Sequence, residues 1–410
     1  MEGASGARRR RRPTTRAHEK PMRAILSTIH RWIGLIAGAY FALAGLTGVV
    51  LLYRSEIDAW LNAGLKGPSR PAHEGETFRP IDALLAAATD RVPADGKPVF
   101  IHLPKSDDGY FDLIYSHPSG HGHPAIGQIV VDPYSGAITG HRVIADPNDR
   151  LAEPFVMLIM HLHYTLLAGE IGETIAGLAG LALLGSLASG LYLWRPLAGP
   201  WRRALFFKRG AGPDRILFDL HRLTGAYVAP LALVIVVSGV CLIFGAQTGS
   251  LIAPFSSVSE HMLPQGLKSE PPRGRPPIGA SAAATAVDGL FADGRLMSIA
   301  PPNGADGVYR VGKHADGEVY ETETKRIVSV DQYSGAILWV QDPREFTVGE
   351  RILEWRFPLH TGEAFGAGGR AVMTVFGFTP TVLFLTGIVR WRRKKRARHV
   401  LPSSRATPNL

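Results

Sequence analysis

The sequence has a single cysteine, Cys241, among 410 residues. A disulfide needs two cysteines, so none can form within the chain. The same shortage excludes a Cys-based zinc or iron–sulfur site and a haem attached through Cys-x-x-Cys-His. The sequence also lacks a P-loop, a dinucleotide-binding fingerprint, a Ser-His-Asp order and a metalloprotease motif. We therefore expect no nicotinamide or flavin domain within it.

Charged residues are missing from four long stretches, residues 32–53, 174–194, 223–253 and 371–389. Each is close to or longer than the roughly 20 apolar residues that an α-helix needs to cross a bilayer. A buried helix of a soluble protein could imitate one such stretch, but four of them with aromatic ends favour membrane spans. The sequence therefore predicts an integral membrane protein with an α-helical four-span bundle.

The positive charge of the chain, a formal net charge of +10, lies beside these stretches. Basic residues precede the first stretch, separate the second from the third and follow the fourth. Basic residues in short connections stay in the cytoplasm, so both termini and the middle loop are expected there. The two long connections then fall outside, where we expect two large periplasmic domains of an inner-membrane protein.

The basic run 8–12 could be a nucleic-acid arm. Its place ahead of a span favours a cytoplasmic tail near anionic lipid, so we expect the lipid bilayer as a partner and no nucleic acid. Translation could begin at Met1 or at Met22, and the second start would remove this tail. The first apolar stretch is too long for a cleavable signal peptide and lacks a small-residue cleavage site.

The expected organisation follows from these spans and loops. It is a cytoplasmic basic tail (1–28), a first span (29–54), a periplasmic domain (55–160), an outer-face helix with the second span (161–196), a cytoplasmic loop (197–218), a third span (219–253), a second periplasmic domain (254–358), an outer-face segment with the fourth span (359–392) and a basic tail (393–410).

The two halves of the sequence resemble each other, as in an internal repeat. "HRWIGLIAGAYFALAGLTGVVLL" from His30 resembles "HRLTGAYVAPLALVIVVSGVCLI" from His221, and "VDPYSGAI" from Val131 matches "VDQYSGAI" from Val330. The spacing from His163 to Trp194 is 31 residues, as is that from His360 to Trp391. Both halves begin in the cytoplasm, so we predict an internal two-fold parallel repeat about an axis along the membrane normal.

Each long connection predicts an α+β domain. Residues 79–93 and 279–294 have the apolar period of an amphipathic helix, and short alternating segments follow each of them. The Asp-Pro-Tyr-Ser-Gly and Asp-Gln-Tyr-Ser-Gly segments supply turn residues between two alternating runs, which predicts a hairpin. We expect a helix packed on a small antiparallel sheet in each domain.

Four histidines occupy corresponding positions of the repeat: His30 with His221, and His163 with His360. The repeat axis would bring each pair to one depth, the first near the cytoplasmic face and the second near the outer face. Two imidazoles that face each other across a bundle can ligate haem iron from both sides. A lone histidine at the end of a span is usually an interfacial residue, but recurrence in both halves favours axial haem ligation.

Three further residues near these histidines have more than one possible role. His161 could replace His163, but its counterpart in the second half is Pro358, which cannot bind a metal, so we favour His163. Arg31 and Arg222 follow the first histidine pair directly and could either contact haem propionates or anchor the spans at the cytoplasmic face.

A third histidine group lies in the first long connection. His117, His121 and His123 could hold zinc or copper, although a solvated loop without a fourth ligand is the simpler interpretation. Apart from this group, no metal beyond haem iron is expected.

These motifs resemble the PepSY-associated transmembrane-helix family, whose members are often described as iron-regulated inner-membrane proteins of bacteria. The resemblance covers about residues 22–396 and rests on several segments together: "HRWIGLIAG", "HRLTGAYVAP", "LHYTLLAGEIG", "LHTGEAFGAGG", "SGLYLWRP", "TGIVRWRR" and the two "VD-x-YSGAI" segments. The resemblance implies two periplasmic PepSY-like domains, two haem b groups and electron flow from inside to outside.

The best understood members of that family are ferric-siderophore reductases. The resemblance therefore implies an oxidoreductase that passes electrons from a cytoplasmic flavoprotein or quinol to a periplasmic ferric chelate, such as a ferric siderophore, to release ferrous iron. Aromatic residues before the fourth span could wall the chelate site or anchor in the lipid interface: Trp339, Phe346, Trp355 and Phe357. Two alternatives are a non-redox PepSY protein that regulates a peptidase and a component of a metal or chelate permease.

Overall fold

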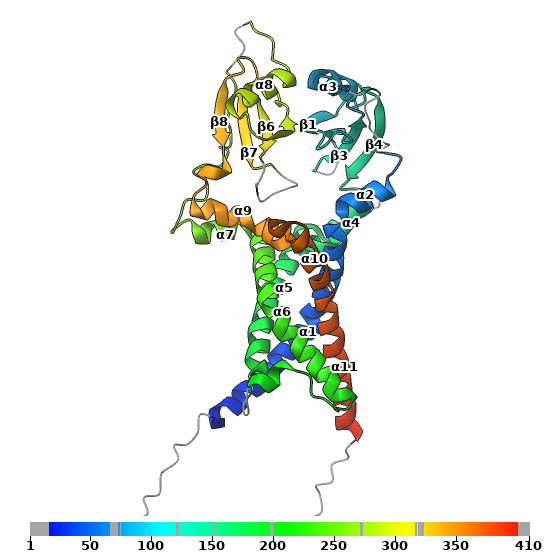
Figure 1. Ribbon diagram of the computed structural model, residues 1–410, viewed down its shortest axis with the longest axis vertical. Coiled ribbons are helices and arrows are strands. Elements are labelled where there is room, and N and C mark those ends of the chain that lie inside the picture. Colours follow the sequence, from blue (N-terminus) through cyan, green and yellow to red (C-terminus); the bar gives the residue numbers. More distant parts are fainter. Residues whose placement is uncertain are drawn as a thin grey trace, which may run out of the picture. The chain divides into compact units, whose positions relative to one another are not determined.

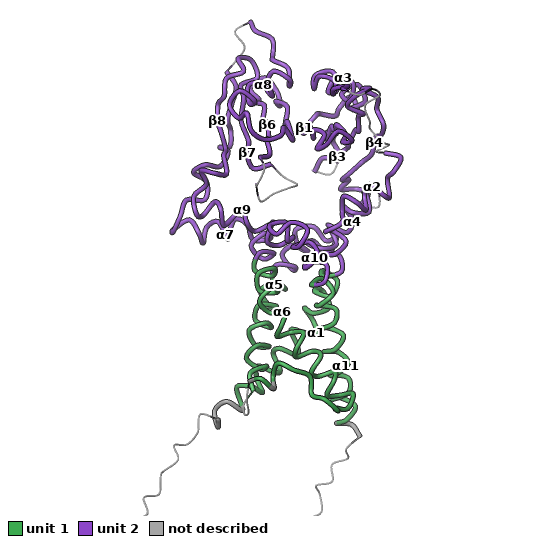
Figure 2. The backbone as a smooth tube through the Cα atoms, viewed as in Figure 1, with its two compact units in different colours: residues 1–45, 178–237, 376–410 green, residues 46–177, 238–375 purple. Residues whose placement is uncertain are grey.

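In the computed structural model of the chain, the described residues are 16–65, 73, 75–119, 123–150, 152–196, 201–270, 274–315, 318 and 324–400. Figure 1 labels most of their helices and strands. The chain divides into two compact units, coloured separately in Figure 2. Unit 1 comprises Met1–Gly45, Leu178–Val237 and Phe376–Leu410, and unit 2 comprises Leu46–Gly177 and Ser238–Val375. The basic run 8–12 lies outside the described residues.

Four helical segments are long and apolar enough to cross a membrane: Pro21–Leu52, Gly169–Trp194, Pro213–Ile243 and Glu363–Ala397. Only 17–28% of each apolar window is buried within the protein, so most of its residues are partly or fully exposed. Outward apolar side chains on this scale require a lipid surround rather than water. The prediction of a membrane protein with four spans is therefore confirmed.

The helix bounds differ from the expected spans at three places. Helix α1 (Arg16–Leu52) begins well before residue 29, with Pro21 in an early turn. Helix α6 (Pro213–Ile243) ends ten residues before the expected end of the third span, and α7 (Gly245–Ile252) starts anew after Phe244. The fourth span is broken at Phe378 between α10 (Gly366–Gly377) and α11 (Thr379–Val400). Pro380 lacks an amide hydrogen and sits in the first turn of α11, where proline is tolerated.

Unit 1 contains α11, most of α1, of α6 and of α5 (Gly169–Trp194), and the short helix η1 (Trp201–Leu205). A Cβ at Gly45 in α1 would overlap the carbonyl oxygen of Gly377, so these two backbones approach closely. Arg23 of α1 donates to the carbonyl of Leu193 at 2.5 Å and so caps the last turn of α5.

Unit 2 contains one antiparallel sheet of eight strands (Figure 1). Its strands are β1 (Lys97–His102), β2 (Phe111–His117), β3 (Ala125–Val131), β4 (Ile138–Ala145), β5 (Arg295–Ala300), β6 (Val308–His314), β7 (Arg326–Asp331) and β8 (Ile337–Gln341). Their order is β4-β3-β2-β1-β5-β6-β7-β8, so each half of the chain contributes four consecutive strands in mirrored order.

The two sets of strands meet at β1 and β5, where Ile101 pairs with Ile299 and His102 with Ser298. We expected two separate small sheets, and the difference has a clear reason. Each set alone would leave an edge strand with unpaired backbone groups, and pairing two such edges satisfies them. Ile101 and Ile299 are fully buried in a single hydrophobic core that draws on both halves.

Helices α3 (Ile81–Thr89) and α8 (Ala280–Leu290) close this core. Leu84 of α3 and Val287 of α8 are buried in it, which confirms the two predicted amphipathic helices. Asp82 Oδ1 accepts from the amide of Ser281 at 3.2 Å, so the N-termini of the two helices also contact each other.

The two predicted hairpins are present as β3–β4 and β7–β8. In the first turn, Asp132 Oδ1 accepts from the amides of Tyr134 and Ser135, each at 2.9 Å. Asp331 makes the equivalent bonds in the second turn. Gly136 and Gly335 have φ of +74° and +72°, a conformation that favours glycine.

Candidate functional site: two opposed histidine pairs

The structure brings the four repeated histidines together as two pairs. In unit 1, the ring centroids of His30 (α1) and His221 (α6) lie 6.3 Å apart with an interplanar angle of 85°. In unit 2, the centroids of His163 and His360 lie 6.3 Å apart with an angle of 66°. His163 is carried by α4 (Phe155–Thr165) and His360 by α9 (Val348–Thr361). Residues that are far apart in sequence thus form two sites of equal ring separation.

This separation fits one metal ion between two imidazoles. A metal–imidazole bond is about 2.0–2.1 Å long and the nitrogen lies roughly 1.1 Å from the ring centroid, so two rings on opposite sides of one ion have centroids roughly 6.3 Å apart. Among the described residues, no group of three or more His, Cys, Asp or Glu side chains could hold a metal ion. A pair of opposed imidazoles therefore suits an ion whose other ligands come with it, as the ring nitrogens of haem do.

A hydroxyl group on a neighbouring helix contacts the Nδ1 atom of each ring. In unit 1, His30 Nδ1 lies 3.0 Å from the carbonyl of Ser186 and 3.3 Å from Ser189 Oγ, and His221 Nδ1 lies 2.8 Å from Thr386 Oγ1. In unit 2, the corresponding contacts are His163 with Thr47 Oγ1 at 2.9 Å and His360 with Ser238 Oγ at 3.4 Å. Hydrogen bonds at this nitrogen are the usual means of orienting a metal-ligating histidine.

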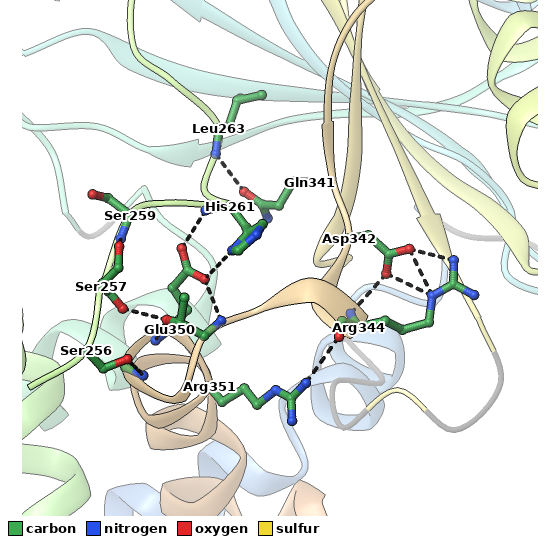
Figure 3. Close-up of polar contacts among 12 residues, drawn as sticks. Ser256, Ser257, Ser259, His261, Leu263, Gln341, Asp342, Arg344, Glu350 and Arg351 are labelled. Carbon is green, nitrogen blue, oxygen red and sulfur yellow. Dashed lines mark hydrogen bonds and ion pairs between the residues drawn. The ribbon is translucent and has the colours of Figure 1, made fainter.

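A buried glutamate begins the helix that carries His360 (Figure 3). Glu350 accepts from the amide of Thr347 at 2.8 Å while Thr347 Oγ1 accepts from the amide of Glu350 at 3.1 Å, which forms a capping box. Glu350 also accepts from the amide of His261 at 2.7 Å, and its other oxygen lies 3.1 Å from His261 Nδ1. These bonds fix the start of α9, two to three turns before His360.

The first half has a comparable glutamate. Glu153 lies ten residues before His163, as Glu350 lies ten before His360. Its carboxylate is buried, accepts from the amide of Asp146 at 3.2 Å and contacts His161 Nδ1 at 2.9 Å. His161 is therefore engaged with Glu153, while the neighbouring His163 faces His360. Neither glutamate was among the predicted site residues, although the capping-box pattern Thr-x-x-Glu and the equal spacing are present in the sequence.

The two arginines beside the first pair have different surroundings. Arg222 contacts Asp219 Oδ1 at 3.1 Å, and Asp219 is fully buried. Arg222 also donates to the carbonyl of Phe206 at 3.2 Å. Arg31 is exposed, and its guanidinium lies 6.0 Å from the ring centroid of Trp32. Arg222 thus ties α6 to the loop before it, and Arg31 lies at the protein surface.

The remaining candidates do not converge on one site. His117 ends β2 and lines a shallow hollow with His123, Asp95 and Lys97, while His121 lies outside the described residues. Of the four aromatic residues before the fourth span, Phe346 is buried and so cannot line an open chelate site, whereas Trp355 is exposed.

Comparison with known proteins identifies the family to which the chain belongs. The family model described as "PepSY-associated TM region" matches residues 27–394, which is most of the chain. No curated protein matches the sequence significantly. The matched range contains the four paired histidines and most of each span, and it agrees with the resemblance seen in the sequence motifs. The chain therefore belongs to the PepSY-associated TM region family.

Proposed function

We propose that this protein is a di-haem b reductase of the bacterial inner membrane that carries single electrons to a periplasmic ferric chelate. The observation that carries the proposal is the presence of two opposed histidine pairs with the same 6.3 Å ring separation. One such pair could arise from packing alone. Two pairs at repeated positions, each ring with a hydrogen-bonding partner at Nδ1, support two bis-histidine haem sites.

His30 and His221 would hold one haem and His163 and His360 the other. Haem b, when bound, supplies reversible one-electron chemistry at its iron. The residues of the chain would supply axial nitrogen ligands and fixed ring orientations. Arg222 retains a buried Nε atom without a hydrogen-bond partner among the described residues, and a haem propionate could accept from it. Arg31 is the second candidate for a propionate contact.

The direction of transfer follows from the expected topology. Electrons would come from a cytoplasmic flavoprotein or from quinol on the side of His30 and His221, and would leave on the side of His163 and His360. The substrate would be a ferric ion held by the hard oxygen donors of a chelate, such as a siderophore. Gaining one electron gives a ferrous ion that such donors bind less well, so the iron is released. No acid or base is needed for this step.

The test uses the full chain purified in detergent. We expect a red protein with the absorption bands of reduced b-type haem and two haems per chain by pyridine-haemochrome assay. After reduction with dithionite and removal of excess reductant, a ferric siderophore should reoxidise it, while a ferrous-specific dye reports the iron released. A monodisperse preparation without haem contradicts the proposal. Haem that a range of ferric chelates fails to reoxidise contradicts the substrate but not the cofactor.

A further inference from the structure

The hydroxyl groups that contact the histidine rings share a sequence feature. Each of the four spans contains a serine or threonine followed directly by glycine, and one such pair contacts each histidine. The four pairs are Thr47-Gly48 in α1, Ser189-Gly190 in α5, Ser238-Gly239 in α6 and Thr386-Gly387 in α11. The first and third pairs correspond in the repeat, as do the second and fourth.

Each pair contacts its ring with both of its residues. The hydroxyl contacts Nδ1, and the glycine lies against Cε1 of the same ring. A Cβ built on the glycine would lie 2.9 Å from His360 Cε1 at Gly239 and 3.0 Å from His30 Cε1 at Gly190. Real Cβ atoms essentially never show the distance found at Gly239, and the distance at Gly190 is tighter than most real Cβ contacts, so a side chain at either position would require the histidine ring to shift. At Gly48 and Gly387 the same distances are 3.4 and 3.7 Å, which are ordinary contacts.

The hydrogen bonds in unit 1 determine which ring nitrogen carries the proton. The carbonyl of Ser186 can only accept, so His30 Nδ1 must donate to it. Thr386 Oγ1 donates to the carbonyl of Val382 at 2.7 Å, which uses its one hydrogen and leaves its lone pairs to accept from His221 Nδ1. With Nδ1 protonated, Nε2 of each neutral ring carries the lone pair that a metal needs.

We propose that these four hydroxyl–glycine pairs are positioning residues for the haem ligands. The hydroxyl is a hydrogen-bond partner for Nδ1, at His30 together with the carbonyl and hydroxyl of Ser186, and so supports the tautomer that presents Nε2. The glycine lets the ring lie directly on the backbone of the neighbouring helix. This inference rests on the proposed function, because it concerns how the histidines bind haem. It goes further by assigning a role to one dipeptide in every span.

The unequal glycine contacts make the proposal testable within each histidine pair. Gly190→Ala should push the His30 ring away and cost most of one haem, so that the haem content falls from two toward one per chain. Gly387→Ala, on the other ligand of the same haem, should cost clearly less. Gly239→Ala should likewise cost more than Gly48→Ala for the other haem. Gly185→Ala is the matched control in α5, because Gly185 is exposed with nothing within 4 Å of a new Cβ.

A second set of variants changes the hydroxyl group and leaves the packing almost unchanged. Thr386→Val preserves the shape of the side chain but removes the hydroxyl acceptor for His221 Nδ1, while Thr386→Ser retains it. We expect the valine variant to shift the midpoint potential of one haem and to raise its high-spin fraction in electron paramagnetic resonance, and the serine variant to resemble the wild type. Added imidazole should restore the low-spin spectrum of the fraction of that haem which Gly190→Ala still binds.

The outcomes separate the two proposals. If the wild-type protein binds no haem, both the proposed function and this inference are contradicted. Wild-type protein with two haems, combined with equal haem loss in Gly190→Ala and Gly387→Ala and an unchanged potential in Thr386→Val, overturns the inference alone. Size-exclusion chromatography of every variant shows whether haem loss reflects ligation or a misfolded protein.

Discussion

The rings of His163 and His360, 197 positions apart in the sequence, lie with their centroids 6.3 Å apart. His30 and His221 have the same separation. Each pair belongs to one compact unit, and no pair mixes the two units. Each pair is therefore expected to act as one site.

The first prediction concerns this pairing. His30→Ala and His221→Ala should each remove the same haem, and His163→Ala and His360→Ala should each remove the other. The double variant within a pair should match either single variant, because one missing ligand already breaks a bis-histidine site. Redox titration of the remaining haem in each variant identifies which site was lost. A common haem for His30 and His163 would contradict the assignment.

The second prediction separates His161 from His163. His161→Ala should retain both haems but lower the free energy of unfolding by about 1–3 kcal/mol, because the buried carboxylate of Glu153 loses its side-chain partner and keeps the amide of Asp146. Thermal unfolding and haem content measure the two effects, and His161→Gln, which keeps a donor, is the control. If His161→Ala loses a haem that His163→Ala keeps, the ligand is His161 and the pair shifts by two residues.

The third prediction concerns pH and the β7–β8 turn. Burial alone would raise the pKa of Asp331, but the backbone donors Ser334 and Tyr333, the Ser334 hydroxyl and the backbone donor Glu270 lower it from 3.8 to about 2. The folded turn thus resists protonation, so its stabilisation is complete above pH 3.8 and is lost as the pH falls toward about 2. The loss should be about 2 kcal/mol.

Hydrogen exchange of residues 326–341 across this range measures that loss. Asp331→Asn should exchange faster at pH 5 and show a flatter dependence on pH. An unchanged pH dependence in this variant would show that another group controls the turn.

The fourth prediction concerns topology and depends only on span length and charge placement. Reporter fusions after Arg398 and within 200–212 should read cytoplasmic, and fusions at 119–123 and 303–307 should read periplasmic. Each pair of neighbouring reporters on opposite sides is separated by one span, so the enzyme signals should alternate. Two adjacent loops on the same side would contradict the parallel repeat.

Local signals sufficed for many elements of the fold. The charge-free stretches predicted four spans because bilayer thickness demands a minimum apolar length, whatever the helices pack against. The Asp-x-Tyr-Ser-Gly segments predicted both hairpin turns, since Asp132 and Asp331 bond to amides only two and three residues away. The helix breaks at Phe244 and Phe378 escaped prediction, because the apolar character continues across both.

Contacts between residues far apart in the chain could not be predicted from the sequence. The repeat predicted which histidines correspond, since that is a matter of spacing, but the 6.3 Å separations depend on helix packing. The union of β1 with β5 joins strands almost 200 residues apart, and no local pattern encodes it. The hydroxyl–glycine pairs are present in the sequence of every span, but the sequence did not predict that they contact the histidine rings.

The sequence by itself thus determined the spans and the turns, because each depends on residues close together in the chain. It also showed the correspondence of the two halves, because similar segments recur in the same order. Only the tertiary structure decided that Gly190 and Gly239 lie against histidine rings while Gly48 and Gly387 leave more room. Such differences of a few tenths of an ångström arise from how neighbouring helices pack. Packing depends on all contacting side chains at once, and no short stretch of sequence specifies it.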